Sequence, residues 1–156
     1  MIVPLDDLDR IMAVMSAAFA PEFGEAWNRR QVEDALVIGN CHYALAFAGA
    51  DPLAAEECAG FSLSRSGVDE EELLLLAVTP AQRGRGHGAR LLERFLEAAR
   101  ARGATRALLE MRQGNPAEQL YRRRQFVQIG SRPNYYRGTN GERVDALTFA
   151  CELGQS

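Results

Sequence analysis

Residues 78–92 read Val-Thr-Pro-Ala-Gln-Arg-Gly-Arg-Gly-His-Gly-Ala-Arg-Leu-Leu. An apolar run precedes this stretch and an amphipathic pattern follows it, so the sequence predicts a strand, a turn and a helix in that order. Its alternate glycines let the backbone take positive φ and approach a ligand closely. The N–H groups and dipole of a helix N-terminus favour an anion, and Arg83 and Arg85 add positive charge. A diphosphate is the ligand that we expect at this turn.

Outward from this turn, hydrophobic periodicity and turn residues predict the other elements. A helix at 8–19, capped by Asp6 or Asp7, comes first, and Asn28 with Gln31 forms a capping box for a helix through residue 37. The predicted strands are 42–48, 60–65, 71–78, 104–111, 126–131 and 144–153; the further helices are 86–102 and 116–124; the loops are 49–57 and 132–141.

The order of these elements predicts a mixed α/β fold flanked by helices. The early strands form a hairpin and pair antiparallel, whereas the central strand–helix–strand unit requires a parallel crossover. The continuous leucines of the 71–78 strand suggest burial on both faces. With 156 residues the chain is expected to form one domain, 1–156.

Composition excludes several classes of protein. The net charge is -3, which argues against a nucleic-acid partner. All 18 basic residues are arginine, and the missing lysine excludes a Walker-type phosphate loop and a lysine Schiff base. His42 and His87 have no metal-ligand neighbours at useful spacing, so no metal is expected.

The cysteines and the apolar segments indicate in which cellular compartment the protein is expected. The three cysteines at 41, 58 and 151 are widely spaced, as in a protein with reduced thiols. The first ten residues carry acidic side chains and no long apolar run, unlike a signal peptide. The longest apolar stretch, 73–78, is too short to span a bilayer. A cytoplasmic protein without membrane contact is expected.

The glycine-rich turn also fits a second pattern. Gly84, Gly86 and Ala89 satisfy G-x-G-x-x-A, the dinucleotide-binding motif, and Glu110 lies near the end of the next strand. Against this reading, the strand ends near Val78, several residues before the first glycine. The chain also offers no second βαβ half to complete a dinucleotide site.

Three motifs together resemble the GNAT family of N-acetyltransferases. The pattern Arg83-x-x-Gly86-x-Gly88 before Leu91-Leu92 matches the family's acyl-CoA signature Q/R-x-x-G-x-G/A. Residues 109–126, Leu-Glu-Met-Arg-x-x-Asn followed by Leu-Tyr and Phe, resemble the strand and helix that come next in that family. Residues 134–136, Asn-Tyr-Tyr, with 145–147, Asp-Ala-Leu, resemble the branch that acetylates the N-terminal alanine of ribosomal proteins.

The resemblance implies a GNAT fold, acetyl-CoA as co-substrate and a bulge that splays the 71–78 strand from the strand carrying Glu110. Asn115 and Tyr121 stand six positions apart where the family usually has seven, which would rotate one of them away from its place. The expected cofactor-binding residues come from the resemblance and from the glycine-rich turn. They are Leu76, Ala77, Val78, Arg83, Gly84, Arg85, Gly86, His87, Gly88 and Asn115.

Acetyl transfer to an amine requires a base, because an α-ammonium with a pKa of about 8 cannot attack. Glu110 is our candidate, acting through a water; it shares a strand face with Leu108 and Arg112, and its apolar neighbours desolvate it. A structural ion pair with Arg112 or with another arginine, without a role in proton transfer, is the alternative. Tyr121 is our candidate acid for the departing thiolate, because a phenol is a fair donor.

The acceptor is expected between two loops. Glu25 and Trp27 lie between the first two helices, and Tyr135 and Tyr136 precede the last strand; aromatics with a carboxylate suit a peptide N-terminus. Two alternatives remain open, a small amine as acceptor and a non-catalytic acetyl-CoA-binding module. Either a monomer or a homodimer is compatible with the sequence.

Overall fold

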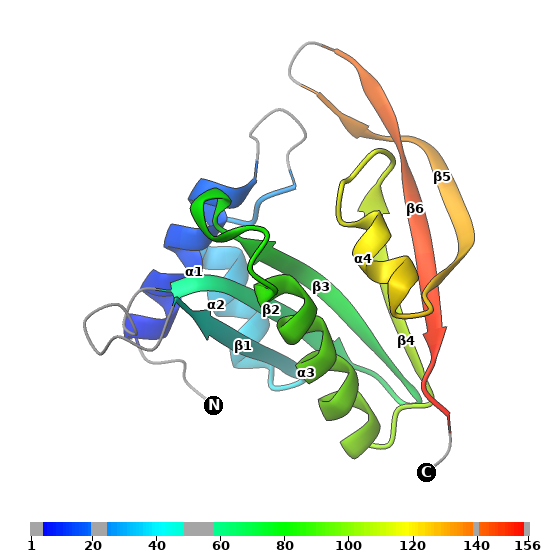
Figure 1. Ribbon diagram of the computed structural model, residues 1–156, viewed down its shortest axis with the longest axis horizontal. Coiled ribbons are helices and arrows are strands. Elements are labelled where there is room, and N and C mark those ends of the chain that lie inside the picture. The colour runs from blue at the N-terminus through cyan, green and yellow to red at the C-terminus, as the bar shows by residue number, and fades with distance from the viewer. Residues whose placement is uncertain (1–4, 20–24, 49–57, 139–140, 155–156) are drawn as a thin grey trace.

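The computed structural model describes residues 5–19, 25–48, 58–138 and 141–154 (Figure 1). The elements follow one another as α1 Leu5–Ala18, α2 Arg29–Ile38, β1 Cys41–Phe47, β2 Cys58–Ser66, β3 Glu70–Val78, the 3-10 turn η2 Pro80–Gln82, α3 His87–Ala101, β4 Arg106–Arg112, α4 Glu118–Arg123, β5 Val127–Arg137 and β6 Arg143–Glu152. The predicted loop 49–57 lies outside the described residues.

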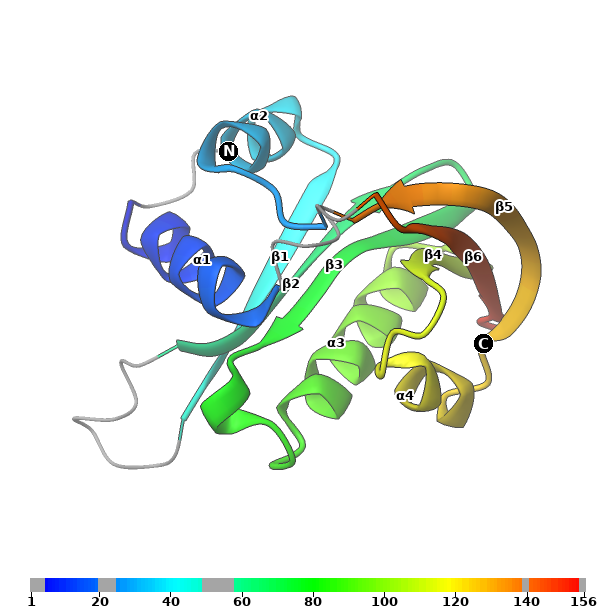
Figure 2. The same ribbon diagram turned by 90° about the horizontal axis from the view of Figure 1, so that it is seen from above.

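One six-stranded sheet organises these elements, in the order β1-β2-β3-β4-β6-β5. Neighbouring strands pair antiparallel except β3 and β4, which pair parallel through the crossover helix α3. Helices α1 and α2 cover one face of the sheet, and α3 and α4 cover the other (Figures 1 and 2). The predicted mixed α/β fold is confirmed.

The two faces of the sheet bury separate apolar clusters. Ile11, Val14 and Met15 of α1 pack with Val32 of α2 and with Phe61 of β2. On the opposite face, α3 contributes an apolar stripe that packs on β4 and β6; its members are Leu92, Phe95, Leu96 and Ala99. These side chains recur at helical spacing, which is why the sequence predicted both helices.

A gap opens in the middle of the sheet because β3 and β4 separate. The two strands pair only from Glu70 to Leu73 on β3 and from Arg106 to Leu109 on β4. Beyond that point β3 continues with β2 alone and β4 with β6 alone. The expected bulge lies at Leu74, where Leu75 stands opposite Leu63 but Leu73 stands opposite Ser64.

The gap explains one wrong prediction about the leucine run. Leu73, Leu75 and Ala77 are buried, but Leu74 and Leu76 are only partly covered and line a cavity. The run is therefore not buried on both faces. A strand is buried on both faces only where helices cover both faces of the sheet, and beyond Leu73 the opening between β3 and β4 leaves one face of β3 at a cavity.

Of the two predicted helix caps, that of α1 is wrong and that of α2 is confirmed. Helix α1 begins at Leu5, so neither Asp6 nor Asp7 caps it; Asp7 instead accepts hydrogen bonds from Arg10 and Tyr43. The predicted capping box of α2 is confirmed, because the Asn28 and Gln31 side chains each accept from the other's backbone N–H at 2.8 Å.

The predicted loop 132–141 is largely strand, because β5 runs on to Arg137. Proline at 133 is tolerated because β5 is an edge strand, where a missing N–H costs no ladder bond. Asn134 takes a φ of 56° and donates its N–H to Asp145 Oδ1 at 2.8 Å, which accommodates a register shift between Arg132 and Tyr136. Sequence reasoning took these turn-forming residues for a loop.

Candidate active site

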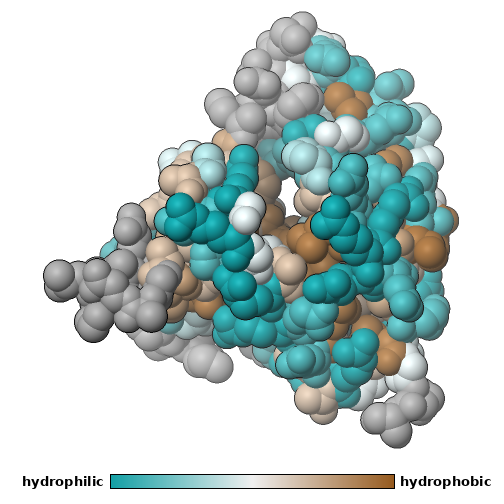
Figure 3. Space-filling model, viewed as in Figure 1, coloured by the Kyte–Doolittle hydropathy of each residue, from teal (hydrophilic) through white to brown (hydrophobic). Residues whose placement is uncertain are grey.

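Two cavities meet at the gap between β3 and β4. One has a volume of about 640 Å³ and the other about 510 Å³. They are joined, because five residues line both of them: Phe19, Glu25, Leu76, Asn115 and Tyr121. The space-filling view shows the surface hollowed there, with hydrophobic side chains inside the hollow (Figure 3).

The glycine-rich turn forms one end of the smaller cavity. Gly84 and Gly86 have φ of 79° and 85°, a conformation that disfavours any residue with a Cβ. Within the described chain, the backbone N–H groups of residues 86–89 make no hydrogen bond, and the first α3 bond runs from Arg90 N–H to the Gly86 carbonyl. Four N–H donors at a helix N-terminus are what a phosphate requires.

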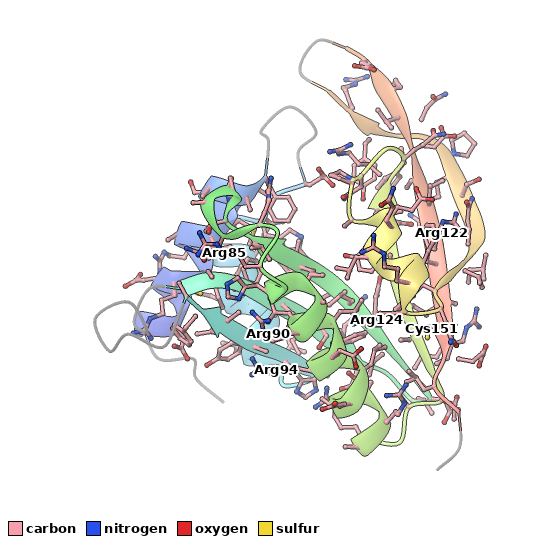
Figure 4. The ribbon with its side chains drawn as sticks, in the orientation of Figure 1. Arg85, Arg90, Arg94, Arg122, Arg124 and Cys151 are labelled. Carbon is pink, nitrogen blue, oxygen red and sulfur yellow. The ribbon has the colours of Figure 1, made fainter. Side chains whose placement is uncertain are left out.

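The arginines of the turn and of the start of α3 play two different roles. Arg83 donates to the carbonyl oxygens of Val78 at 3.2 Å and Ala18 at 3.0 Å, so it ties the turn to β3 and α1 while still lining the cavity. Arg85 in the turn and Arg90 and Arg94 on α3 are exposed (Figure 4), and they make no salt bridge within the described part of the chain. They leave this corner positively charged.

His87 is the first residue of α3 and is buried at the cavity wall. Its Nδ1 accepts from Arg90 at 3.0 Å. Burial lowers the pKa of His87, and the charges of Arg90 and Arg85 lower it further. The imidazole is therefore neutral at pH 7 and carries its proton on Nε2.

Replacing Gly86 with valine should weaken the binding of CoA, the ligand expected from the sequence, about tenfold. A β-branched residue at a φ of 85° costs about 1–2 kcal/mol, and relaxing that strain turns the N–H groups of the turn. Calorimetry with CoA measures the effect, and Gly103→Val, at a φ of 91° beyond the far end of α3, is the matched control. Equal CoA affinity in the Gly86 variant and the parent protein would contradict this role of the turn.

The edge of β3 and the start of α4 form the walls between the cavities. Leu76, Ala77 and Val78 line the smaller cavity, beyond the last pair that β3 makes with β4. Asn115 Oδ1 accepts from Ala117 N–H at 2.9 Å, which turns the chain into the six-residue helix α4. Asn115 and Tyr121 each line both cavities, at the gap between β3 and β4.

Tyr121 is a buried phenol whose ring packs edge-to-face on Phe126, with 5.8 Å between the ring centroids. Burial raises the pKa of Tyr121 well above the ordinary value, and the charge of Glu25 raises it further. The phenol is therefore protonated at any physiological pH.

Glu110 reaches the larger cavity from β4. Its Oε2 lies 3.3 Å from Arg132 Nε and 3.5 Å from Thr148 Oγ1, and 22% of its side chain is exposed. The alternative partner considered from the sequence, Arg112, instead binds Glu25 at 3.0 Å. Glu110 therefore keeps an accessible carboxylate, and its ion pair is with the mostly exposed Arg132.

The expected acceptor residues come together in the larger cavity. Glu25 and Trp27 line it from the segment before α2, and Tyr135 and Tyr136 line it from β5. The two tyrosine rings meet edge-to-face at 5.2 Å. Burial raises the pKa of Tyr136 to about 12, with further contributions from Glu110 and Glu25.

Sequence reasoning missed several cavity residues. Phe19 lines both cavities, Arg137 and Glu72 line the larger one, and Arg112 and Leu120 line the smaller one. Of these residues, only Arg112 could have been predicted from the sequence, because the strand period of two places it on the same face of β4 as Glu110. The others belong to elements whose approach to the gap depends on the sheet opening.

This fold and pair of joined cavities define a known class of protein. Residues 10–126 match the acetyltransferase (GNAT) family, and the chain belongs to that family. The glycine-rich turn, the opened strand pair and the carboxylate on β4 all lie within the matched segment.

Two of the similar proteins are named as alanine N-acetyltransferases of a ribosomal protein. The chain is 33% identical over 94 residues to the [ribosomal protein bS18]-alanine N-acetyltransferase of Haemophilus influenzae, a match covering 60% of this chain and 64% of that protein. The match thus spans less than two thirds of that relative. The fold resembles the crystal structure of the ribosomal-protein-S18-alanine N-acetyltransferase from Escherichia coli, with TM-score 0.80, 25% identity and coverage of 100% and 94%.

A third likeness is to the crystal structure of nourseothricin acetyltransferase, with TM-score 0.64, 29% identity and coverage of 75% of this chain and 68% of that one. The dinucleotide-binding alternative does not fit the fold, because β3–β4 is the only parallel pair among the described strands. No helix in the described ranges is long and apolar enough to cross a membrane.

Proposed function

We propose that this protein transfers the acetyl group of acetyl-CoA to the N-terminal amine of a protein or peptide that begins with alanine. The observation that carries the proposal is the pair of joined cavities, one ending on free helix N–H groups and the other on carboxylates and tyrosines. The names of the relatives at 33% and 25% identity support the choice of acceptor.

The proposed cofactor site follows from the smaller cavity. The N–H groups of residues 86–89 hold the diphosphate, with Arg85 nearby. The unpaired edge of β3 at Leu76–Val78 and the side chain of Asn115 hold the pantetheine arm. Acetyl-CoA supplies an activated thioester, and this arrangement brings its acetyl end to the residues that both cavities share.

The proposed chemistry then uses two side chains at the junction. Glu110 removes a proton from the acceptor ammonium through a water, which releases the lone pair for attack on the thioester carbon. The C–N bond forms and the C–S bond breaks, and the thiolate takes the proton of Tyr121. The acylated nitrogen then gives up its second proton through water to the Tyr121 phenolate, which leaves a neutral amide and restores the acid. Glu25 and Trp27, with Tyr135 and Tyr136, hold the acceptor chain.

A small-molecule amine is the second candidate acceptor. The likeness to nourseothricin acetyltransferase favours it, and acceptor residues vary freely on a common fold. The two candidates differ in what the larger cavity must hold, an extended peptide or one compact amine.

Two measurements test the proposal. Mass spectrometry of cellular N-termini with and without this protein should show loss of acetylation on one or a few proteins that begin with alanine. In vitro, a peptide starting with alanine should be acetylated faster than any member of a panel of small amines. The reverse ranking would favour the second candidate, and CoA binding without turnover on any acceptor would leave only a binding module.

The rate of acetyl transfer should show no alkaline fall below about pH 10. The acid must be protonated to serve the thiolate, and burial moves the pKa of Tyr121 above the phenol's ordinary value of about 10, so the alkaline fall of the rate moves upward too. A profile of kcat against pH measures this. A fall centred below pH 10 that disappears in Tyr121→Phe would contradict the assignment.

A further inference from the structure

The ion pair between Glu25 and Arg112 crosses the gap at the point where the two cavities meet. Arg112 ends β4, and Glu25 lies in the segment that leads into α2, on the other side of the separated strands. Arg112 Nε lies 3.0 Å from Glu25 Oε1, across 87 residues of sequence. Glu25 lines both cavities, whereas Arg112 lines only the smaller one.

The ion pair between Glu25 and Arg112 is less exposed to solvent than the other ion pairs at the larger cavity. The side chains of Arg112 and Glu25 are only 19% and 12% exposed. By comparison, Glu110 pairs with an arginine that is 62% exposed, and Glu72 with one that is 52% exposed. Solvent screens those two contacts strongly, whereas a largely buried, hydrogen-bonded pair keeps its geometry.

Glu25 also lies close to both phenols of the site. Its charge contributes to the raised pKa of Tyr121 and to that of Tyr136, and Arg112 acts on Tyr136 in the opposite direction. The carboxylate therefore acts electrostatically on the proposed acid of the reaction and on a tyrosine of the proposed acceptor cavity, and it lines both cavities itself.

From this arrangement we infer that Arg112 is a positioning residue, which acts through Glu25. The guanidinium holds the Glu25 carboxylate across the gap, so that the second carboxylate oxygen can receive the acceptor ammonium beside Tyr121. The inference rests on the proposed function and adds a residue that sets how well the acceptor binds. It also explains why the end of β4 carries a cation although the cofactor phosphates bind at the start of α3.

Kinetics of three variants test the inference. In Arg112→Gln, kcat/KM for a peptide beginning with alanine should fall about ten- to hundredfold through a raised peptide KM, because the receiving carboxylate loses its fixed position. CoA affinity by calorimetry should fall far less than kcat/KM, although Arg112 also lines the smaller cavity. Arg112→Lys should restore most of the loss. Arg106→Gln, on the same strand and paired with Glu70 at 3.3 Å, should leave the peptide KM unchanged.

A double variant separates positioning from direct contact. If Arg112 acts through Glu25, adding Arg112→Gln to Glu25→Gln should cause no further loss. A further loss, or a fall in CoA affinity with an unchanged peptide KM, would overturn the inference and make Arg112 a cofactor contact.

One measurement is independent of turnover. Hydrogen exchange at residues 25–28 should accelerate in Arg112→Gln and not in Arg106→Gln, whatever the acceptor is. Unchanged exchange would refute the positioning role even if the parent protein acetylated no peptide, whereas faster exchange in a protein without turnover would count against the proposed function alone.

Discussion

Replacing Glu110 with glutamine should lower kcat for acetyl transfer to an alanine-starting peptide by about a hundredfold or more, with CoA affinity unchanged. A base that removes the ammonium proton contributes roughly 10²–10⁴ in rate, and an amide cannot accept that proton. The carboxylate lines the larger cavity and not the cofactor cavity, so CoA binding should not sense the change. Steady-state kinetics and calorimetry on the same preparation measure both quantities.

Glu70→Gln is the matched control for that experiment. Glu70 is a carboxylate on the neighbouring strand that also pairs with an arginine, but it lies at the paired end of β3 and β4, outside both cavities of the site. It should leave kcat unchanged. A Glu110 variant that turns over as fast as the control would remove Glu110 as the base, and Glu25 would be the next carboxylate to examine.

Replacing Arg102 with methionine should destabilise the fold by about 3 kcal/mol. Arg102, just beyond α3, makes a bidentate ion pair with Glu71 on β3, through Nε and through Nη2 at 2.8 Å. Glu71 is 1% exposed, so the variant would leave a carboxylate buried without its partner. For a chain of this size, the melting temperature should fall by roughly 6–12 °C.

Arg65→Met is the control for this experiment, because it removes an ion pair that is exposed and not buried. Arg65 binds Glu72 at 2.7 Å, yet the two side chains are 52% and 36% exposed, so its loss should cost about 1 kcal/mol or less. Denaturant unfolding of both variants, compared with the parent protein, gives the two values. Equal small losses would show that water reaches Glu71 when Arg102 is removed.

Local signals explain why much of the fold could be predicted. The apolar stripe of α3 and the alternation along β4 identified these elements, because helical and strand periods differ. Asn28 and Gln31 placed the start of α2 through hydrogen bonds only three residues apart. The predictions were wrong where a residue distant in sequence determines the local structure. In β5, pairing with β6 and the hydrogen bond from Asn134 to Asp145 keep turn-forming residues in a strand.

For the site, the sequence by itself determined the glycine-rich turn proposed to hold the diphosphate, because glycines, arginines and a helix start are neighbours along the chain. It also determined which face of β4 carries Glu110. Only the tertiary structure decided which charges meet: Arg112 with Glu25 across 87 residues, and Arg132 with Glu110. The physical reason is that spacing fixes the direction of a side chain on its own element, whereas the opening of β3 from β4 fixes what lies opposite.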